Sequence, residues 1–499
     1  MRKKFIKVIT IFIIAGLIGA ITLQLQTAEA FGVAVSPQQQ REAYIQKRVK
    51  NPHTVLQLEL ATVKREKQHW NNSTIESREF QFNNGDLYWH DKITFEHGGE
   101  NLIYIISYKG VNGTLTYYNE KMGKWIEEQE LTEGRLPVTD LFLTIGNRHI
   151  LLNQPFIYKD LGCGVVKAMN DLCHEIMVTK TAEGFQLQMC FVNKPGTWGE
   201  IWALESDSPL LDWNYGAMRQ IWVGYSYAKD NRWLMDGSYY IMPKTYSPYQ
   251  KNTYWKNPGV YVVSGFILTG GSKAADDLGY AQLYIQAQNM DAKGYMKTMP
   301  RSNWLYNAYG IEADFYDSRF NTDLGILFIE AYEKFNEQRF LDYALKYGNF
   351  FMKFANKHHY TVLDSRGKEG WLVQDYYHEN GKYRLPHSSL NHQLEEIRFL
   401  YKLGKTTGNS SFTLLGDKML KGIENTCNSW IKSDKNLYYC YYANGKFGGA
   451  DYPYLTYNDL FNLQKLLEDT GGDHNPYLQK LMDAKKIYMD SNGIRTYKK

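Results

Sequence analysis

The spacing of apolar residues along the chain changes near residue 272. Between about residues 80 and 270, runs such as "FQLQMCFV", "QIWVGYSY" and "GVYVVSGFIL" are rich in β-branched and aromatic residues, as is typical of strands. The run "LIYIISYKGVNGTLTYY" has the pattern of two strands joined by a turn at Asn112-Gly113. No strong helical period interrupts these runs, so we expect a β-rich domain over residues 81–270.

After residue 272 the apolar residues recur at helical spacing. Leu324, Leu327, Phe328 and Ala331 lie at i, i+3, i+4 and i+7, which places them on one face of a helix. The same spacing begins again at Leu390. Further helices are expected in "SKAADDLGYAQLYIQAQNMD", "RFLDYALKYGNFFMKFA", "FTLLGDKMLKGIENTCNSWI", "TYNDLFNLQKLLEDTG" and "PYLQKLMDAKKIYMD".

Strands followed by helices predict a multidomain α+β protein. The β-rich N-terminal and middle region would be followed by a second domain over residues 271–499. Its helices are of similar length and alternate with loops, which suggests an α/α-barrel, also called a toroid. In that architecture loop residues surround one open end.

The N-terminus has the pattern of a secretory signal peptide over residues 1–30. Four basic residues precede an apolar run from Val8 to Leu23, and Ala28-Glu29-Ala30 forms a small-x-small cleavage pattern. An uncleaved anchor is the alternative, and in both cases we expect a secreted or cell-surface protein. Residues 31–80 are polar and basic, which indicates a linker and local elements. No later stretch is apolar enough for a membrane span.

Charge and composition exclude several classes of function. The formal charge of +4 falls to near +1 without residues 1–30, which argues against nucleic acid as a partner. Five cysteines make no disulfide scaffold or zinc motif, and no nucleotide fingerprint is present. The aromatic fraction of 15% suits either sugar binding or aromatic pairs in a large sheet. The sequence does not decide whether a structural calcium ion is bound or whether the protein forms a homodimer.

Three loops in the helical half are dense in tyrosine and ionisable residues. They are "NWLYNAYGIEADFYDSRFNTD", "WLVQDYYHENGKYRLPHSSLNH" and "NLYYCYYANGKFGGADYPYLTYND". Without a metal motif, these residue types suit proton abstraction at C5 of a uronic acid. A cation would stabilise the enolate-like transition state, and a tyrosine with a lowered pKa would carry the proton.

The fate of that proton separates two reactions. Its return to the opposite face gives epimerisation, and loss of a group from C4 gives β-elimination. Hydrolysis by paired carboxylates also stays open, through Asp314, Asp375, Glu379 and Asp459.

The start of the helix near Leu390 also has an ordinary structural interpretation. Ser388 or Ser389 would be its N-cap, and His387 and His392 would form hydrogen bonds at the helix start. A solvated helix face would carry Glu395, Glu396 and Arg398.

Residues 295–490 resemble the C-terminal domain of the D-glucuronyl C5-epimerases of heparan sulfate and heparosan biosynthesis. Three segments carry the resemblance: "DFYDSRFNTDLGILFIEAYEKF", "KYRLPHSSLNHQLEEIRFLYKLGKTTGN" and "YPYLTYNDLFNLQKLLED". Members of that family also have a β-rich middle region and an α/α-barrel end.

The resemblance implies a set of site residues. Tyr383 corresponds to the family tyrosine before Pro-x-Ser-Ser, Tyr439 to the middle tyrosine, and Tyr457 to the tyrosine opening the last helix. Lys382 stands where the family has Glu, so Tyr376 or Tyr377 is an alternative to Tyr383. Tyr442 stands where the family has Arg, so Arg384 or Arg319 would supply the cation. The substrate-binding set is Arg384, Arg319, Tyr316, His387, Asn391, Tyr442 and Tyr454.

The sequence therefore predicts a secreted uronic-acid C5-epimerase acting on a uronic-acid-containing polysaccharide, without cofactor or catalytic metal. Two tyrosines on opposite faces of the sugar would exchange the C5 proton. A polysaccharide lyase and a non-catalytic polysaccharide-binding protein are the alternatives.

Overall fold

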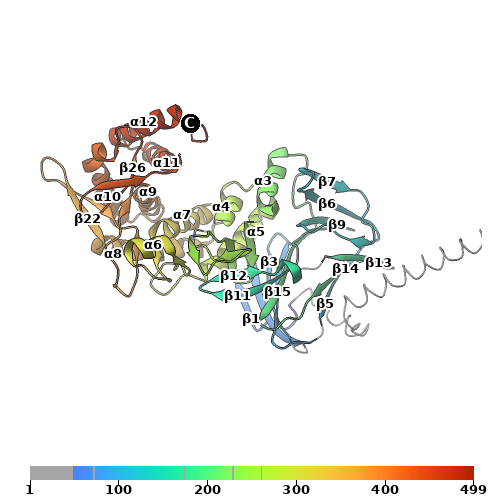
Figure 1. The fold of residues 1–499 in the computed structure, drawn as a ribbon. Helices are drawn as coiled ribbons and strands as arrows, with labels where there is room; N and C mark the ends of the chain where they lie inside the picture. Colours follow the sequence, from blue (N-terminus) through green and yellow to red (C-terminus); the bar gives the residue numbers. More distant parts are fainter. Residues whose placement is uncertain are drawn as a thin grey trace, which may run out of the picture. The chain divides into compact units, whose positions relative to one another are not determined.

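A computed structural model describes residues 49–70, 73–99, 101–172, 175–227, 230–259 and 261–498 (Figure 1). The predicted signal peptide lies outside the described residues. The chain forms two compact units. The first comprises residues up to 160 with 167–228 and 272–274, and the second comprises residues 161–166, 229–271 and 275 onward.

From residue 49 to residue 227, the described chain forms antiparallel strands and one α-helix of 12 residues. In chain order they are β1 (Thr54–Gln57), β2 (Ala61–Trp70), β3 (Ser73–Phe82), β4 (Leu87–Phe95), β5 (Leu102–Lys109), β6 (Gly113–Asn119), β7 (Lys124–Glu128), β8 (Gly134–Arg135), β9 (Leu141–Ile145), β10 (Arg148–Leu152), β11 (Phe156–Gly162), β12 (Val165–Ala168), β13 (Met177–Thr181), β14 (Gly184–Phe191), β15 (Thr197–Ser206) and α3 (Gly216–Tyr227). A short 3-10 turn spans Asn170–Leu172.

Two sheets enclose the core of this unit. One contains the run β1-β2-β3-β4-β15, with β10, β9, β6 and β7 joined to it, and the other is β5-β14-β13-β8. Alternate residues face inward, as the strand period of two requires. Ile75, Ile93 and Ile201 of the first sheet meet Ile106 and Leu187 of the second in one hydrophobic cluster.

The structure corrects three expectations for this region. The strands β5 and β6 do not form a hairpin, because β5 pairs with β14 while β6 pairs with β7 and β9. The segment 31–80, expected to be a linker with local elements, contains β1, β2 and most of β3, which are successive strands of a sheet in which β3 pairs with β4. "QIWVGYSY" is the end of helix α3, where Met218 and Trp222 are buried four residues apart.

The second unit contains most of the helices. They are α4 (Tyr261–Leu268), α5 (Lys273–Ala287), α6 (Asn303–Tyr309), α7 (Ser318–Phe335), α8 (Gln338–Lys357), α9 (Leu390–Thr407), α10 (Ser410–Trp430), α11 (Leu455–Asp469) and α12 (Pro476–Ser491). Its strands are short: β16 (Asn231–Leu234), β17 (Gly237–Ile241), β18 (Tyr246–Ser247), β19 (Thr253–Trp255), β20 (Arg301–Ser302), β21 (Tyr316–Asp317), β22 (His359–Leu363), β23 (Glu369–Val373), β24 (Tyr376–Tyr377), β25 (Ser388–Ser389), β26 (Tyr438–Tyr441) and β27 (Phe447–Ala450).

The helices predicted after residue 272 are confirmed. Two described helices of this unit were not expected. Helix α6 lies in the first tyrosine-rich segment, which was expected to be a loop. Helix α4 replaces the strand expected in "GVYVVSGFIL", where Val263, Phe266 and Ile267 are buried at helical spacing. A short apolar run is compatible with a buried helix as well as with a strand, so periodicity alone does not distinguish the two structures in this segment.

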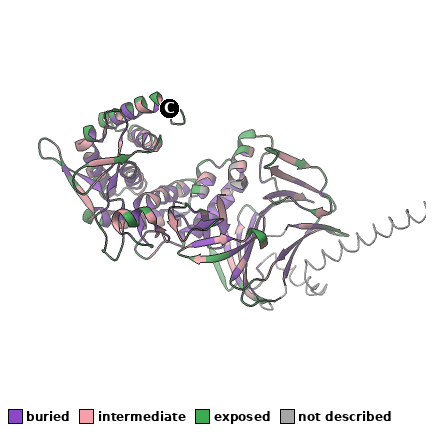
Figure 2. Cartoon of the chain, in the orientation of Figure 1, coloured by how far each residue is buried: buried purple, intermediate pink, exposed green. Residues whose placement is uncertain are grey.

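Helix α9 lies among its neighbours, in contact with α7, α8, α10 and α11. Its buried residues therefore cover more than one face (Figure 2). Glu395 and Glu396 are buried, so the predicted solvated face of this helix is wrong. The closure of the helices into an α/α-barrel stays a prediction. No described helix is both long and apolar enough to cross a membrane.

Candidate active site

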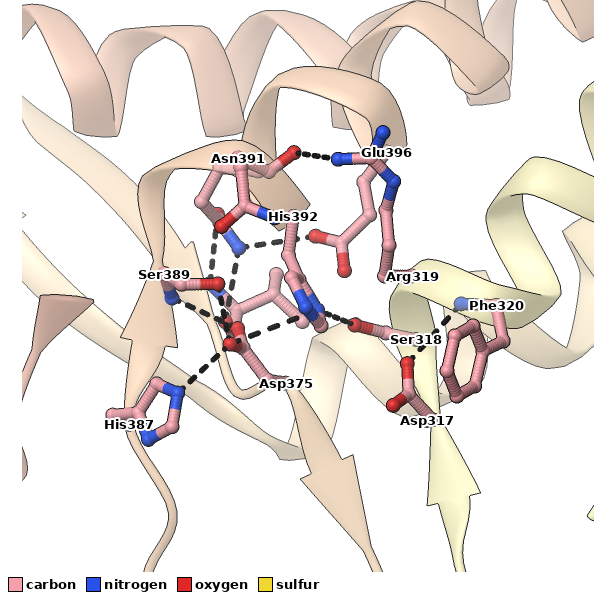
Figure 3. Close-up of polar contacts among 12 residues, drawn as sticks. Asp317, Ser318, Arg319, Phe320, Asp375, His387, Ser389, Asn391, His392 and Glu396 are labelled. Atoms are coloured by element: carbon pink, nitrogen blue, oxygen red, sulfur yellow. Dashed lines mark hydrogen bonds and ion pairs between the residues drawn. The ribbon is translucent and has the colours of Figure 1, made fainter. Parts of the chain in front are cut away.

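A buried carboxylate, Asp375, lies between β23 and β24 at the start of α9 (Figure 3). The backbone N–H of Ser389 donates to Oδ1 at 2.9 Å, and the Ser389 hydroxyl donates to Oδ2 at 2.5 Å. Ser389 is the N-cap residue of α9 by position, as expected, but its hydroxyl bonds to Asp375 instead of the helix. The second loop of the sequence thus folds around this carboxylate.

Two histidines surround the same carboxylate. Nε2 of His387 lies 3.1 Å from Asp375 Oδ2, and Nδ1 of His392 lies 3.6 Å from it. Burial alone would raise the pKa of Asp375, but the two histidines and Ser389 hold this pKa below its ordinary value. Asp375 is therefore ionised at neutral pH.

His387 connects this carboxylate to a tyrosine. Its Nδ1 lies 2.7 Å from the hydroxyl of Tyr309, the last residue of α6. Since Asp375 favours a proton on Nε2, Nδ1 is the acceptor and the Tyr309 hydroxyl donates. Burial raises the pKa of Tyr309, so its phenol is protonated at neutral pH. We call these three residues, Tyr309, His387 and Asp375, the relay.

Aromatic rings enclose the imidazole of His387, whose side chain is 1% exposed. The ring centroids of Tyr439, Tyr376 and Trp304 lie 5.3, 5.5 and 5.7 Å from that of His387. Tyr442 meets it edge to face at 6.3 Å. Tyr309 is half-buried, whereas His387 and Asp375 are buried, so Tyr309 is the most exposed member of the relay.

Neutral side chains lie behind the relay. Nδ1 of His392 is 2.9 Å from the Ser318 hydroxyl, and burial lowers the pKa of His392 to about 4. Burial, and then Asp375, raise the pKa of Glu396 well above its ordinary value. Gln393 donates to Glu396 at 3.0 Å. Burial thus favours the neutral forms of both His392 and Glu396, and Asp375 is the carboxylate placed to compensate a positive charge on His387.

The two candidate cations, Arg319 and Arg384, differ in their exposure and in the groups that they contact. Nη1 of Arg319 lies 2.7 Å from Asp459 Oδ2, its Nε lies 2.9 Å from Asp323 Oδ1, and its side chain is 14% exposed. It is engaged with carboxylates of the protein itself, so it is not available to a substrate carboxylate. Arg384 is exposed, and its backbone N–H donates to the Tyr309 carbonyl at 2.8 Å. Arg384 is the candidate cation that lies beside the relay.

The predicted catalytic tyrosines fall into separate places. Tyr376 and Tyr439 lie against His387, whereas Tyr377 and Tyr383 contact each other, with ring centroids 6.4 Å apart. Tyr383 and Tyr309 both pack against a small apolar cluster that contains Tyr376. The ring contact of Tyr457 is with Tyr497, 5.0 Å away. The structure therefore does not bring Tyr457 to the relay.

The predicted binding residues are similarly divided. His387 and Tyr442 belong to the enclosure just described, and Tyr454 is exposed at the start of α11. Tyr316 is buried, and its hydroxyl lies 3.0 Å from that of Tyr347. Asn391 is buried, and its carbonyl accepts a hydrogen bond from Arg319. Tyr316 and Asn391 thus support the fold beneath the site.

The tyrosines do not have the lowered pKa that the sequence predicted. Burial raises the pKa of Tyr376, Tyr383, Tyr439 and Tyr457. A phenol here cannot act as a base unless a neighbour removes its own proton. The relay supplies such a neighbour for Tyr309, a residue that the sequence did not single out as catalytic. Only the density of tyrosine in its loop marked it.

Two of the four carboxylates considered above for hydrolysis, Asp459 and Glu379, form ion pairs with basic side chains. Asp459 pairs with Arg319, and Glu379 pairs with Lys293 at 2.6 Å. Hydrogen bonds from Lys293 and Tyr295 lower the pKa of Glu379 to about 2, so it is no general acid at neutral pH. Among the described residues, no three His, Cys, Asp or Glu side chains are grouped as metal ligands. The calcium ion stays a prediction.

No protein-family model matches the chain, and no curated protein matches it. Parts of several solved structures are similar to it. D-mannose isomerase has 13% identity and a TM-score of 0.34, over 46% of this chain and 59% of that chain. A family 76 glycoside hydrolase (mannosidase) from Bacteroides thetaiotaomicron has 13% identity and a TM-score of 0.35, over 55% and 68%. A cellobiose 2-epimerase from Bacillus thermoamylovorans has 16% identity and a TM-score of 0.33, over 47% and 59%.

Proposed function

We propose that the protein is an enzyme acting on a polysaccharide, and that it exchanges the C5 proton of a uronic acid residue. The observation that carries this proposal is the relay, in which a half-buried tyrosine is hydrogen-bonded to a histidine whose Nε2 lies 3.1 Å from a buried carboxylate. A weakly acidic C–H needs a base of this kind, aligned before the substrate arrives.

Proton removal would proceed through Tyr309. As the Tyr309 oxygen takes the proton from C5, its own proton passes to Nδ1 of His387. Asp375, 3.1 Å from Nε2, stabilises the resulting imidazolium. The electron pair of the C5–H bond moves into the sugar carboxylate. The exposed Arg384, whose backbone N–H donates to the Tyr309 carbonyl and whose guanidinium donates to the Asn307 carbonyl at 2.9 Å, would stabilise that charge.

Epimerisation requires a second donor on the opposite face of the sugar. Tyr442 is our candidate, because its partly exposed ring meets His387 from the hairpin of β26 and β27. Tyr457, in contact with Tyr497, is not the second donor in this proposal. We propose heparosan-like chains as substrates and a location outside the cytoplasm, on the strength of the segments quoted above and of residues 1–30.

One observation favours a lyase as the second candidate. Among the described residues of the candidate site, Tyr309 is the one tyrosine with such a relay. A similar chain of Tyr88, His90 and Glu200 is buried in the β-rich unit, to which these loops do not belong. One such tyrosine suffices for β-elimination, because after taking the C5 proton it can return a proton to the oxygen that leaves C4. The bond from C4 to that oxygen then breaks as the C4–C5 double bond forms.

Solvent exchange tests the relay directly. We expect Tyr309→Phe and His387→Gln each to lower deuterium incorporation at C5 of heparosan about 10²- to 10⁴-fold, the usual contribution of a general base. Tyr457→Phe is the matched control and should exchange at the wild-type rate. Full activity in Tyr309→Phe together with loss in Tyr457→Phe would refute this assignment.

A further inference from the structure

Trp304 and Tyr452 are exposed aromatic residues beside the relay. They are 48% and 45% exposed, although large aromatic side chains usually bury most of their surface. Trp304 lies on α6, and Tyr452 follows β27. Each is in ring contact with the enclosure of the relay, Trp304 with His387 and Tyr452 with Tyr439.

Both rings meet their neighbours by an edge. Trp304 lies at 89° to Tyr309 and at 76° to Tyr376, and Tyr452 lies at 77° to Tyr439. In the described part of the chain, no ring stacks in parallel on either of them. Exposed Tyr306 differs, because the guanidinium of Arg301 lies 4.5 Å over its ring.

The backbone holds both rings in place. Helix α6 is capped at its start by Ser302 and at its end by Gly310, which adopts a left-handed conformation with φ of 78°. The carbonyl of Tyr452 accepts a hydrogen bond of 2.7 Å from buried Lys485. With the backbone fixed in this way and the rings packed by an edge against their neighbours, both side chains would lose little conformational entropy when a ligand stacks on them.

We propose that Trp304 and Tyr452 are two sugar-stacking platforms on either side of the reacting residue, so that the substrate is an internal residue of a chain. This inference rests on the proposed function. Aromatic faces pack against the C–H faces of pyranose rings, and the two platforms are linked through the rings of His387 and Tyr439. A sugar at Tyr309 would thus have a neighbour on each side.

Binding of heparosan oligosaccharides of defined length, measured by calorimetry, tests the platforms. We expect Trp304→Ala and Tyr452→Ala each to weaken octasaccharide binding about 2- to 10-fold, the range for one aromatic contact, and to leave disaccharide binding nearly unchanged. Trp304→Phe and Tyr452→Phe retain an aromatic face and should restore most of the affinity. Tyr477→Ala, at an equally exposed tyrosine on α12, is the control and should bind like the wild type.

The outcomes separate this inference from the proposed function. Octasaccharide affinity unchanged in both alanine variants would overturn the platforms, even if His387→Gln abolished proton exchange. Weakened binding in both alanine variants, with no C5 exchange by the wild type, would support the platforms in a polysaccharide-binding protein and overturn the enzymatic proposal.

Discussion

Replacing Lys485 by Met should destabilise the hairpin that carries Tyr439 and Tyr442. The Lys485 side chain is fully buried in α12, and its ammonium reaches three acceptors. Its Nζ lies 2.6 Å from Asp451 Oδ2, 2.7 Å from Asn436 Oδ1 and 2.7 Å from the Tyr452 carbonyl. One side chain therefore holds both ends of the segment that contains β26 and β27.

The expected loss in the free energy of unfolding comes from Asp451, whose buried carboxylate would remain without its cation. Asp451 is buried, and in Lys485→Met its carboxylate would lose its cation, a change that costs about 3–5 kcal/mol in comparable pairs. The double variant Lys485→Met with Asp451→Asn should recover part of this loss, because no charge is then buried alone. Lys486→Met is the control, since Lys486 pairs with Asp490 at the surface and should unfold like the wild type.

Urea unfolding measures the free energy, and hydrogen exchange of the β26 amides reports on the hairpin itself. Lys485→Met should lower the urea midpoint and expose the β26 amides before those of α7. A loss below about 1 kcal/mol, with β26 still protected, would refute the view that this ammonium holds the hairpin.

Two further predictions concern packing and pH. Gly422→Ala should lower the free energy of unfolding by about 1–3 kcal/mol, because the added Cβ would lie 2.2 Å from the Trp371 carbonyl oxygen. Gly216→Ala, where nothing lies within 4 Å, should be neutral in the same urea titration. Burial raises the pKa of Glu79 from 4.5 to about 7, so the fold favours the neutral acid. This contribution is complete below pH 4.5 and is lost as pH rises through 7, so Glu79→Gln should reduce the fall in stability between these values. An unchanged pH profile in Glu79→Gln would contradict this pKa.

The helical half of the fold could be predicted from the sequence because its helices have one clear apolar face. The failures have physical causes. Helices α3 and α4 lie in short runs where apolar residues also occupy positions outside the buried face, so aromatic and β-branched content suggested strands instead. Glu395 and Glu396 are buried because α9 is surrounded by other helices, and no local pattern reports how many neighbours a helix has.

The loops of the candidate site could be predicted, but the pairing within them could not. The density of tyrosine and histidine marked loops that the structure brings together, including those of His387, Tyr376 and Tyr439. The relay joins Tyr309 to a histidine 78 residues later, a long-range contact that sequence spacing does not encode. The resemblance favoured Tyr457, whose ring packs against Tyr497 near the C-terminus.

Proton NMR of heparosan incubated with the protein in heavy water tests the central proposal most directly. We predict deuterium at C5 of the uronate and iduronate-type signals, with the chain length unchanged. Exchange accompanied by chain cleavage and unsaturated uronate ends would identify the lyase instead. Binding of the polymer without any C5 deuterium would contradict the proposal that Tyr309, His387 and Asp375 move a proton at this carbon.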